Sequence, residues 1–162
     1  GYEIARLGVA LNMDVEAIRR TPTGDEPCST FAFDQLDAVL GRADWVCVAL
    51  PLTPDTREIF HPARFAQMKQ GAFFINVGRG ELVDEDALIH ALRTQHLAGA
   101  ALDVFATEPL PADSPLWEMP NVIVTPHSSG ASTSAGLRSE KIFVHNVANY
   151  ISGHRLTNEV TL

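Results

Sequence analysis

Four polar side chains follow apolar runs of this sequence, at the points where buried strands would end. They are Arg79, Asp103, Glu108 and His127. Because ligands of open parallel sheets bind beyond the carboxyl ends of the strands, we expect these residues to meet at one edge of a sheet. Arg79 lies between two glycines, and Asp103 closes its own apolar run, where an unpaired carboxylate would be costly.

This set of side chains has a coherent chemistry. A histidine donates or accepts the proton of an alcohol or ketone near neutral pH, and a carboxylate on its second ring nitrogen fixes the tautomer and favours the charged ring. An arginine fork binds a carboxylate with two hydrogen bonds and polarises an adjacent carbonyl. The substrate that fits such a trio is a small 2-keto or 2-hydroxy acid, with the hydride supplied by a nicotinamide cofactor.

Each of these residues also has an ordinary structural role open to it. Arg79 could be a surface turn residue, and Glu108 could be a solvated loop residue. His127 could be a hydrogen-bonded histidine at a strand end, and Asp103 could cap a neighbouring backbone amide. The other histidines have no metal-like spacing, so we expect no metal site and interpret them as surface or helix-face residues: His61, His90, His96, His145 and His154.

The composition is that of an ordinary globular protein. The chain has 162 residues, of which 46% are hydrophobic and 20% are charged, which is enough for about one domain. Its net charge of −8 argues against a basic face that binds nucleic acid. No apolar run approaches the roughly 18 residues of a membrane span, and no signal sequence opens the chain. We therefore expect a cytoplasmic protein that binds neither nucleic acid nor a membrane.

Strand-like and helix-like segments alternate along the chain, which predicts an α/β fold with a mostly parallel sheet. The expected strands are residues 13–18, 44–50, 72–77, 99–104 and 121–125. The expected helices are residues 2–11, 33–40, a helix that begins after the N-cap Asp84, and 132–151, where Ile142, Val144, Val147 and Ile151 are available for a buried stripe. Such apolar runs suit strands buried on both faces, so Cys47 is expected to be a small core residue.

Four blocks of sequence resemble the D-isomer-specific 2-hydroxyacid dehydrogenase family, which includes glyoxylate/hydroxypyruvate reductases. They are A-D-W-V-C-V-A-L-P-L-T-P-D-T-R, M-K-Q-G-A-F-F-I-N-V-G-R-G-E-L-V-D-E-D-A-L, L-A-G-A-A-L-D-V-F-A-T-E-P-L-P and L-W-E-M-P-N-V-I-V-T-P-H-S-S-G. They cover most of the chain in the family's order. The resemblance implies an NAD(P)-dependent oxidoreductase with a doubly wound, Rossmann-like fold.

The resemblance also implies a role for each matching residue. Arg79 resembles the arginine that binds and polarises the substrate, Glu108 the carboxylate partner of the histidine, and His127 the general acid and base. Asp103 resembles the residue that holds the nicotinamide carboxamide. Arg79 and His127 also belong to the implied cofactor site, together with positions that line the cofactor in relatives: Pro51, Thr56, Val77 and Gly130.

The first twenty residues resemble a helix and the second strand of a dinucleotide-binding fold. Gly1 then matches the third glycine of G-x-G-x-x-G, while the first strand and the first two glycines are absent. Arg19 and Arg20 stand where relatives that prefer NAD carry an acidic residue. Arginines there suit a 2′-phosphate, so NADP(H) is the preferred cofactor, with NAD(H) possible and a solvated basic pair as the alternative.

Members of the family have two domains, and most of the substrate domain precedes the cofactor domain. We therefore expect residues 1–152 to form an incomplete NAD(P)-binding domain, with residues 153–162 as a tail toward an absent substrate domain. A separate segment or a partner chain could supply the missing central strand, or the remaining strands could close up. The isolated chain is expected to be a partial enzyme with weak turnover, and by resemblance a homodimer. The alternatives are a corepressor-like interaction module and an inactive dinucleotide-binding fragment.

Overall fold

The computed structural model describes residues 1–132 and 134–159. The chain divides into two compact units, Gly1–His127 and Ser128–Leu162. The predicted boundary after residue 152 stays a prediction.

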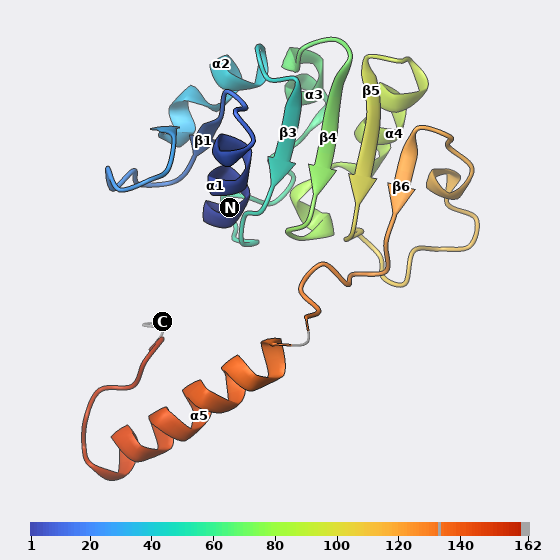
Figure 1. The fold of residues 1–162 in the computed structure, drawn as a ribbon. Coiled ribbons are helices and arrows are strands. Elements are labelled where there is room, and N and C mark those ends of the chain that lie inside the picture. Colours follow the sequence, from blue (N-terminus) through green and yellow to red (C-terminus); the bar gives the residue numbers. More distant parts are fainter. Residues whose placement is uncertain (133, 160–162) are drawn as a thin grey trace. The chain divides into compact units, whose positions relative to one another are not determined.

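The first unit is built on parallel strands. A four-stranded sheet has the order β3 (Trp45–Val48), β4 (Ala72–Asn76), β5 (Leu97–Leu102) and β6 (Val122–Val124). A separate two-stranded sheet pairs β1 (Glu16–Ile18) with β2 (Ser29–Phe31). Every pair is parallel, so the carboxyl ends of the larger sheet lie at one edge (Figure 1). The predicted α/β class with a Rossmann-like parallel sheet is confirmed.

The two sheets do not join. Among the described residues, no strand precedes the first helix, β1 pairs only with β2, and β3 pairs only with β4. The described strands therefore form two separate sheets, and how the missing central strand is supplied stays a prediction. The strand β2 is not among the predicted strands, because its three residues, Ser-Thr-Phe, show no apolar run.

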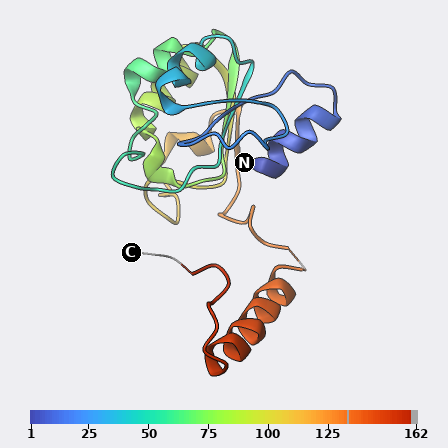
Figure 2. The ribbon, with the colours of Figure 1, turned by 90° about the vertical axis from the view of Figure 1, so that its left-hand side faces the viewer.

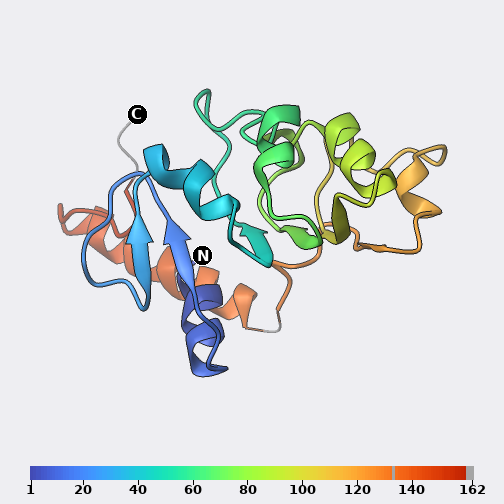
Figure 3. The ribbon, with the colours of Figure 1, turned by 90° about the horizontal axis from the view of Figure 1, so that it is seen from above.

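Helices cover the strands unevenly. The views in Figure 2 and Figure 3 place α2 (Leu36–Leu40), α3 (Pro62–Gln67) and α4 (Glu85–Arg93) on one side of the strands and α1 (Tyr2–Ala10) on the other. The predicted start of α4 is confirmed, since the Asp84 carboxylate accepts the backbone N–H of Ala87 at 3.0 Å. The helix α3 was not predicted from the sequence. Short 3₁₀ turns occupy residues 33–35, 80–82 and 115–117.

The hydrophobic core lies between α2–α4 and the four-stranded sheet. Its centre is a cluster of aromatic rings, in which Phe74 of β4 meets Phe60 and Phe65 edge-on at centroid distances of 4.9 and 5.2 Å. Phe74 has no exposed surface, and Phe65 is 2% exposed. This packing fixes β4, which carries the Gly-Arg-Gly turn at its carboxyl end.

The opposite face of the same sheet is apolar but exposed. On β3 and β4, Trp45 stacks on Phe73 with a centroid distance of 4.4 Å, and both rings remain partly accessible. Ile123 on β6 is 66% exposed. Cys47 lies on this face and is exposed, so its prediction as a core residue is wrong, as is the expected burial of the strands on both faces. Alternate residues of a strand point to opposite faces, and here only one face meets helices.

The second unit contains one long helix, α5 (Ala135–Ile151). It begins three residues after the predicted Ser132, and none of its residues is buried, including the four proposed for a buried stripe. The chain after it folds back, because Asn146 binds the backbone of Thr157 at 2.8 and 3.0 Å and Asn149 binds the Arg155 carbonyl at 3.0 Å. Among the described residues, no helix is long and apolar enough to cross a membrane.

Candidate active site

The predicted meeting of Glu108 and His127 is found in the structure. Glu108 follows β5 and His127 follows β6, and the Nδ1 atom of His127 lies 2.8 Å from Oε2 of Glu108. The other carboxylate oxygen of Glu108 accepts the backbone N–H of Phe105 at 3.0 Å. The two side chains are partly exposed, at 45% and 36% for histidine and glutamate, so the imidazole is fixed on one side and open to solvent on the other.

The charge of Glu108 is stabilised by its neighbours. The hydrogen bond from His127 lowers the pKa of Glu108 below its usual value of 4.5, and the backbone N–H of Phe105 lowers it further. The positive charge of Arg79 also lowers the pKa of Glu108. Arg79, Glu108 and His127 therefore form one electrostatic group at the carboxyl edge of the sheet, although in the described part of the chain Arg79 donates to the Gly78 carbonyl and not to the other two side chains.

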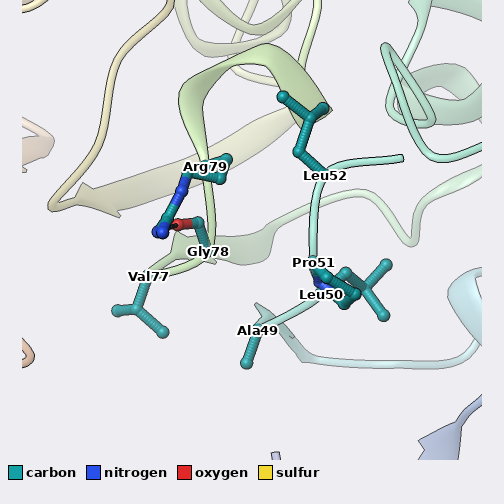
Figure 4. A pocket seen from close by; sticks show the side chains of 7 residues that line it. All are labelled: Ala49, Leu50, Pro51, Leu52, Val77, Gly78 and Arg79. Atoms are coloured by element: carbon teal, nitrogen blue, oxygen red, sulfur yellow. Dashed lines mark hydrogen bonds between the residues drawn. The ribbon is translucent and has the colours of Figure 1, made fainter. Parts of the chain in front are cut away.

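A buried asparagine shapes the turn that carries Arg79. Asn76 ends β4 and is 1% exposed. Its amide donates to the Arg79 carbonyl at 3.0 Å, and its amide oxygen accepts the Gly78 N–H at 3.0 Å. The guanidinium of Arg79 folds back onto the Gly78 carbonyl at 2.7 Å (Figure 4). The side chain of Arg79 is exposed.

Gly80 brings this turn against the loop that carries Glu108. A Cβ atom on Gly80 would lie 1.8 Å from the Phe105 carbonyl carbon, which no side chain can tolerate. The same loop is held from α4, where Glu85 accepts the backbone N–H of Ala106 at 3.3 Å. The absence of a side chain at Gly80 thus sets the distance between the Arg79 and Glu108 loops.

The ends of β5 and β6 are also tied together. Asp103 is 3% exposed, and its Oδ1 accepts the Thr125 hydroxyl at 2.5 Å. His127 follows two residues later with a left-handed backbone (φ 50°), and its N–H binds the Thr125 carbonyl at 3.1 Å. A non-glycine residue in this region is strained by an amount on the order of 1 kcal/mol, and such strain clusters at functional sites.

A pocket lies beside Arg79 at the carboxyl ends of β3 and β4. It is lined by Leu50, Pro51, Val77 and Gly78, among others (Figure 4). A Cβ atom on Gly78 would lie 2.9 Å from the side chain of Leu82 and 3.0 Å from the Leu50 carbonyl. Only glycine therefore lets the two strand ends approach this closely. Pro51 and Val77, two of the residues predicted to line the cofactor, both line this pocket.

Thr56 lies outside this pocket, in the loop that follows Pro51. It is 5% exposed, and its hydroxyl donates to the Pro51 carbonyl at 2.8 Å and accepts the Thr53 N–H at 2.8 Å. In the described structure the hydroxyl is therefore committed to the loop itself. Direct contact of Thr56 with a cofactor stays a prediction.

The predicted cofactor residues at the start of the chain lie on the first unit. Gly1 precedes α1 and is exposed, and its carbonyl accepts the Ala5 N–H at 3.0 Å. Arg19 and Arg20 follow β1, and Arg20 approaches Asp55 of the loop after β3 at 3.8 Å. Gly130 belongs to the second unit, so it is not placed relative to the other predicted residues.

Sequence reasoning missed Asn76 and Thr125 as parts of the site. Asn76 offered a signal, since it is a polar residue inside an apolar run that leads into Gly-Arg-Gly. Thr125 offered none, because a threonine at a strand end is ordinary. No group of three histidine, cysteine or acidic side chains suited to a metal ion occurs among residues 1–132 and 134–159.

A profile of the family described as D-isomer specific 2-hydroxyacid dehydrogenase, NAD binding domain, matches residues 1–129. Glyoxylate/hydroxypyruvate reductase B of Citrobacter koseri is 41% identical over 160 residues, covering 93% of this chain and 49% of the relative. The protein of the same name from Salmonella newport is 47% identical over 149 residues, covering 92% of this chain and 46% of the relative. The chain spans about half the length of these curated relatives.

Solved structures agree with this match. A D-isomer specific 2-hydroxyacid dehydrogenase from Xanthobacter autotrophicus Py2, in complex with NADPH and MES, superposes with a TM-score of 0.90 at 42% identity. The alignment covers 98% of this chain and 66% of that one. An NADPH-dependent glyoxylate/hydroxypyruvate reductase from Sinorhizobium meliloti, in complex with NADP and sulfate, gives a TM-score of 0.91 at 39% identity. The alignment covers 99% of this chain and 52% of that one.

Proposed function

The chain belongs to the D-isomer specific 2-hydroxyacid dehydrogenase family, and we propose that it forms the nicotinamide-binding part of an oxidoreductase that interconverts a small 2-keto acid and the 2-hydroxy acid. The observation that supports this most is the contact of 2.8 Å between His127 and Glu108, at the sheet edge that also carries Arg79. Such an edge is where ligands of parallel α/β proteins bind.

His127, Glu108 and Arg79 each have a separate role in proton transfer or substrate binding. With Nδ1 held by Glu108, the other ring nitrogen of His127 faces the substrate oxygen, donates its proton in the reduction and takes it back in the oxidation. The negative charge of Glu108 stabilises the charged imidazole. Arg79 binds the substrate carboxylate and polarises the neighbouring carbonyl. A bound nicotinamide supplies the hydride for C2 of the keto acid.

The residues present fit a dinucleotide. Gly78 lines the pocket at the ends of β3 and β4, and its lack of a side chain lets these two strand ends approach closely. Pro51 and Val77 line it, and Asp103 stands at the end of the next strand to hold the carboxamide. Arg19 and Arg20 supply positive charge after β1, which favours NADP(H) over NAD(H). The NADPH in the Xanthobacter complex and the NADP in the Sinorhizobium complex support this preference.

The names of the relatives suggest glyoxylate or hydroxypyruvate as substrate. We further propose that the enzyme works as a homodimer in the cytoplasm, and that this chain alone turns over weakly, because it spans about half the length of its relatives. Turnover by the isolated, monomeric chain at the rate of a complete reductase would contradict this last point.

Titration of the purified chain with NADPH and with NADH, followed by nicotinamide fluorescence, tests the cofactor assignment. We expect saturable binding of both, with NADPH tighter. Binding of neither would contradict the proposal that this chain assembles the cofactor site.

The His127→Ala variant tests the chemistry. The reduction of glyoxylate or hydroxypyruvate should fall by about 10²- to 10⁴-fold, the usual contribution of a general acid, while NADPH affinity changes little. The surface variant His90→Ala serves as the matched control, since His90 is exposed on α4. An unchanged rate in His127→Ala would contradict the role of His127.

A further inference from the structure

Asn76 is a buried polar residue at the end of an interior strand, and it connects the turn after β4 to the end of β5. Its amide oxygen accepts the Gly78 N–H and its amide nitrogen donates to the Arg79 carbonyl, both at 3.0 Å. Its backbone carbonyl accepts the Asp103 N–H at 3.0 Å. The side chain of Asn76 therefore holds the turn that carries Arg79, and its backbone fixes this turn to β5.

The hydrogen bonds continue from β5 to the histidine. The buried Asp103 accepts the Thr125 hydroxyl on Oδ1 at 2.5 Å. The Thr125 carbonyl accepts the His127 N–H at 3.1 Å, where the backbone of His127 is left-handed. With Asn76, these bonds form one path, here called the strand-end path. It crosses the ends of β4, β5 and β6 and runs from the Arg79 carbonyl to the His127 N–H (Figure 1).

The imidazole ring of His127 is held from the end of the same strand. Glu108 contacts Nδ1 of the ring at 2.8 Å with one carboxylate oxygen and accepts the Phe105 N–H at 3.0 Å with the other. Phe105 follows Asp103 by two residues. The backbone and the ring of His127 are therefore both held by hydrogen bonds that lead to the end of β5.

The proposed reaction requires Arg79 and His127 at a set separation. The carboxylate and the keto oxygen of a 2-keto acid lie on adjacent carbon atoms, so both side chains must bind one small molecule at the same time. A misplacement of about 1 Å in such an arrangement costs on the order of 10²-fold in rate. Bonds that fix the turn of Arg79 and the backbone of His127 to one strand meet this requirement.

We propose that Asn76 and Thr125 are positioning residues for the keto acid. Through the strand-end path they set the distance between Arg79, which binds the carboxylate, and His127, which faces the keto oxygen. The inference rests on the proposed function, because it assigns both ends of the path to one substrate. Asn76 and Thr125 act through their neighbours and not by contact with the substrate. Since the loss of either one breaks the same path, the effects of the two losses overlap.

Oxalate is the probe for this proposal, because its two carboxylates take the places of the substrate carboxylate and keto group. Its dissociation constant from the chain saturated with NADPH is measured by isothermal titration calorimetry. Thr125→Val removes the hydroxyl, keeps the shape of the side chain and should weaken oxalate by about tenfold, the worth of one hydrogen bond. Thr125→Ser keeps the hydroxyl and should stay within about twofold of the wild type.

A double variant tests whether the two residues act through one path. Asn76→Ala alone should also weaken oxalate by about tenfold. Independent losses would multiply to about 100-fold, whereas losses that share a path should give the double variant a loss on the order of 10- to 30-fold. Losses that multiply, or a wild-type affinity in Thr125→Val, would overturn the proposal.

Two exposed residues outside the strand-end path supply the matched controls. Thr94→Val removes a hydroxyl that donates to the His90 carbonyl at 2.9 Å, and Asn121→Ala removes an amide that donates to the Ala98 carbonyl at 3.2 Å. Both should leave the oxalate affinity within about twofold of the wild type.

Thermal unfolding shows whether each variant is folded at the temperature of the titration. If Asn76→Ala does not fold, the comparison of Thr125→Val with Thr125→Ser decides, because Thr125 is exposed and its replacement leaves the core intact. Equal oxalate affinities in these two variants would then contradict the proposal.

The wild-type titration separates the failure of the inference from that of the proposed function. If the wild-type chain saturated with NADPH binds no oxalate, the proposed substrate class and this inference both fall. If it binds oxalate and Thr125→Val binds it equally well, only the inference is overturned.

Discussion

The pairing of Glu108 with His127 links the chemistry of the site to its response to pH. The carboxylate is ionised through the neutral range, because His127 and the Phe105 N–H lower the pKa of Glu108. A group whose pKa is lowered by folding stabilises the folded state above its usual pKa, and this stabilisation is lost as the pH falls through the lowered value. The contribution of Glu108 is therefore full above about pH 4.5 and disappears in more acidic solution.

Glu108→Gln tests this linkage. The variant should lose up to about 1 kcal/mol of stability at neutral pH, a small amount because the side chain is 36% exposed. As the pH falls below 4.5, the unfolding curves of wild type and variant should converge. Thermal unfolding of wild type and variant, measured from pH 3 to pH 7 in steps of about one pH unit, gives the difference in stability. A gap that stays constant to the lowest pH would show that the charge of Glu108 does not stabilise the fold.

Asn76 gives a second prediction for a single side chain. Removing its amide in Asn76→Ala leaves the buried Gly78 N–H and the Arg79 carbonyl without their partner, at a cost of about 1–3 kcal/mol. Asn121→Ala is the control, because Asn121 makes an exposed bond of 3.2 Å to the Ala98 carbonyl and should cost under about 1 kcal/mol. Denaturant unfolding compares the two, and equal costs would mean that Asn76 does not brace the turn.

Contacts between elements explain why two loops distant in sequence form one site. Gly80→Ala would place a methyl group 1.8 Å from the Phe105 backbone, so the turn after β4 and the loop after β5 must separate. We expect Gly80→Ala to lower the free energy of unfolding by about 1–3 kcal/mol or more, and to weaken the electrostatic interaction between Arg79 and Glu108. The control is Gly41→Ala, where the nearest atom is 3.6 Å away and the backbone is helical, so stability should change by under about 1 kcal/mol. Denaturant unfolding of both variants measures these costs.

The long elements were predictable from the sequence, and the short ones were not. Residues 72–77 and 99–104 are apolar runs, and β4 and β5 lie within two residues of them. The strand at 13–18 shrinks to Glu16–Ile18, and β2 was missed, because three residues hold no periodicity. The placement of the polar side chains at one edge of the sheet followed from the predicted parallel topology alone. The Asn76 amide contacts and the Gly80 approach depend on loop geometry, which no residue pattern records.

The molecule as a whole leaves apolar surface on one face of its larger sheet. Trp45, Phe73 and Ile123 lie on this face and are exposed, although the runs that contain them are typical of doubly buried strands. In the same unit, the edges of β1 and β3 that face away from their partners have no strand beside them among the described residues. Exposed strand edges and apolar faces both favour association. We therefore expect the isolated chain to self-associate through this face.

Two neighbouring phenylalanines on β4 test this expectation, because they point to opposite faces. Phe74 has no exposed surface, and Phe74→Ala should cost about 3–5 kcal/mol, as for other large core residues. Phe73 is 36% exposed, and Phe73→Ala should cost only about 0.5–1.5 kcal/mol, mainly its stacking on Trp45. Phe73→Ala should also reduce the concentration dependence of sedimentation and the binding of an apolar fluorescent dye. If Phe73→Ala is as destabilising as Phe74→Ala, or leaves self-association unchanged, the exposed face is not the surface through which the chain associates.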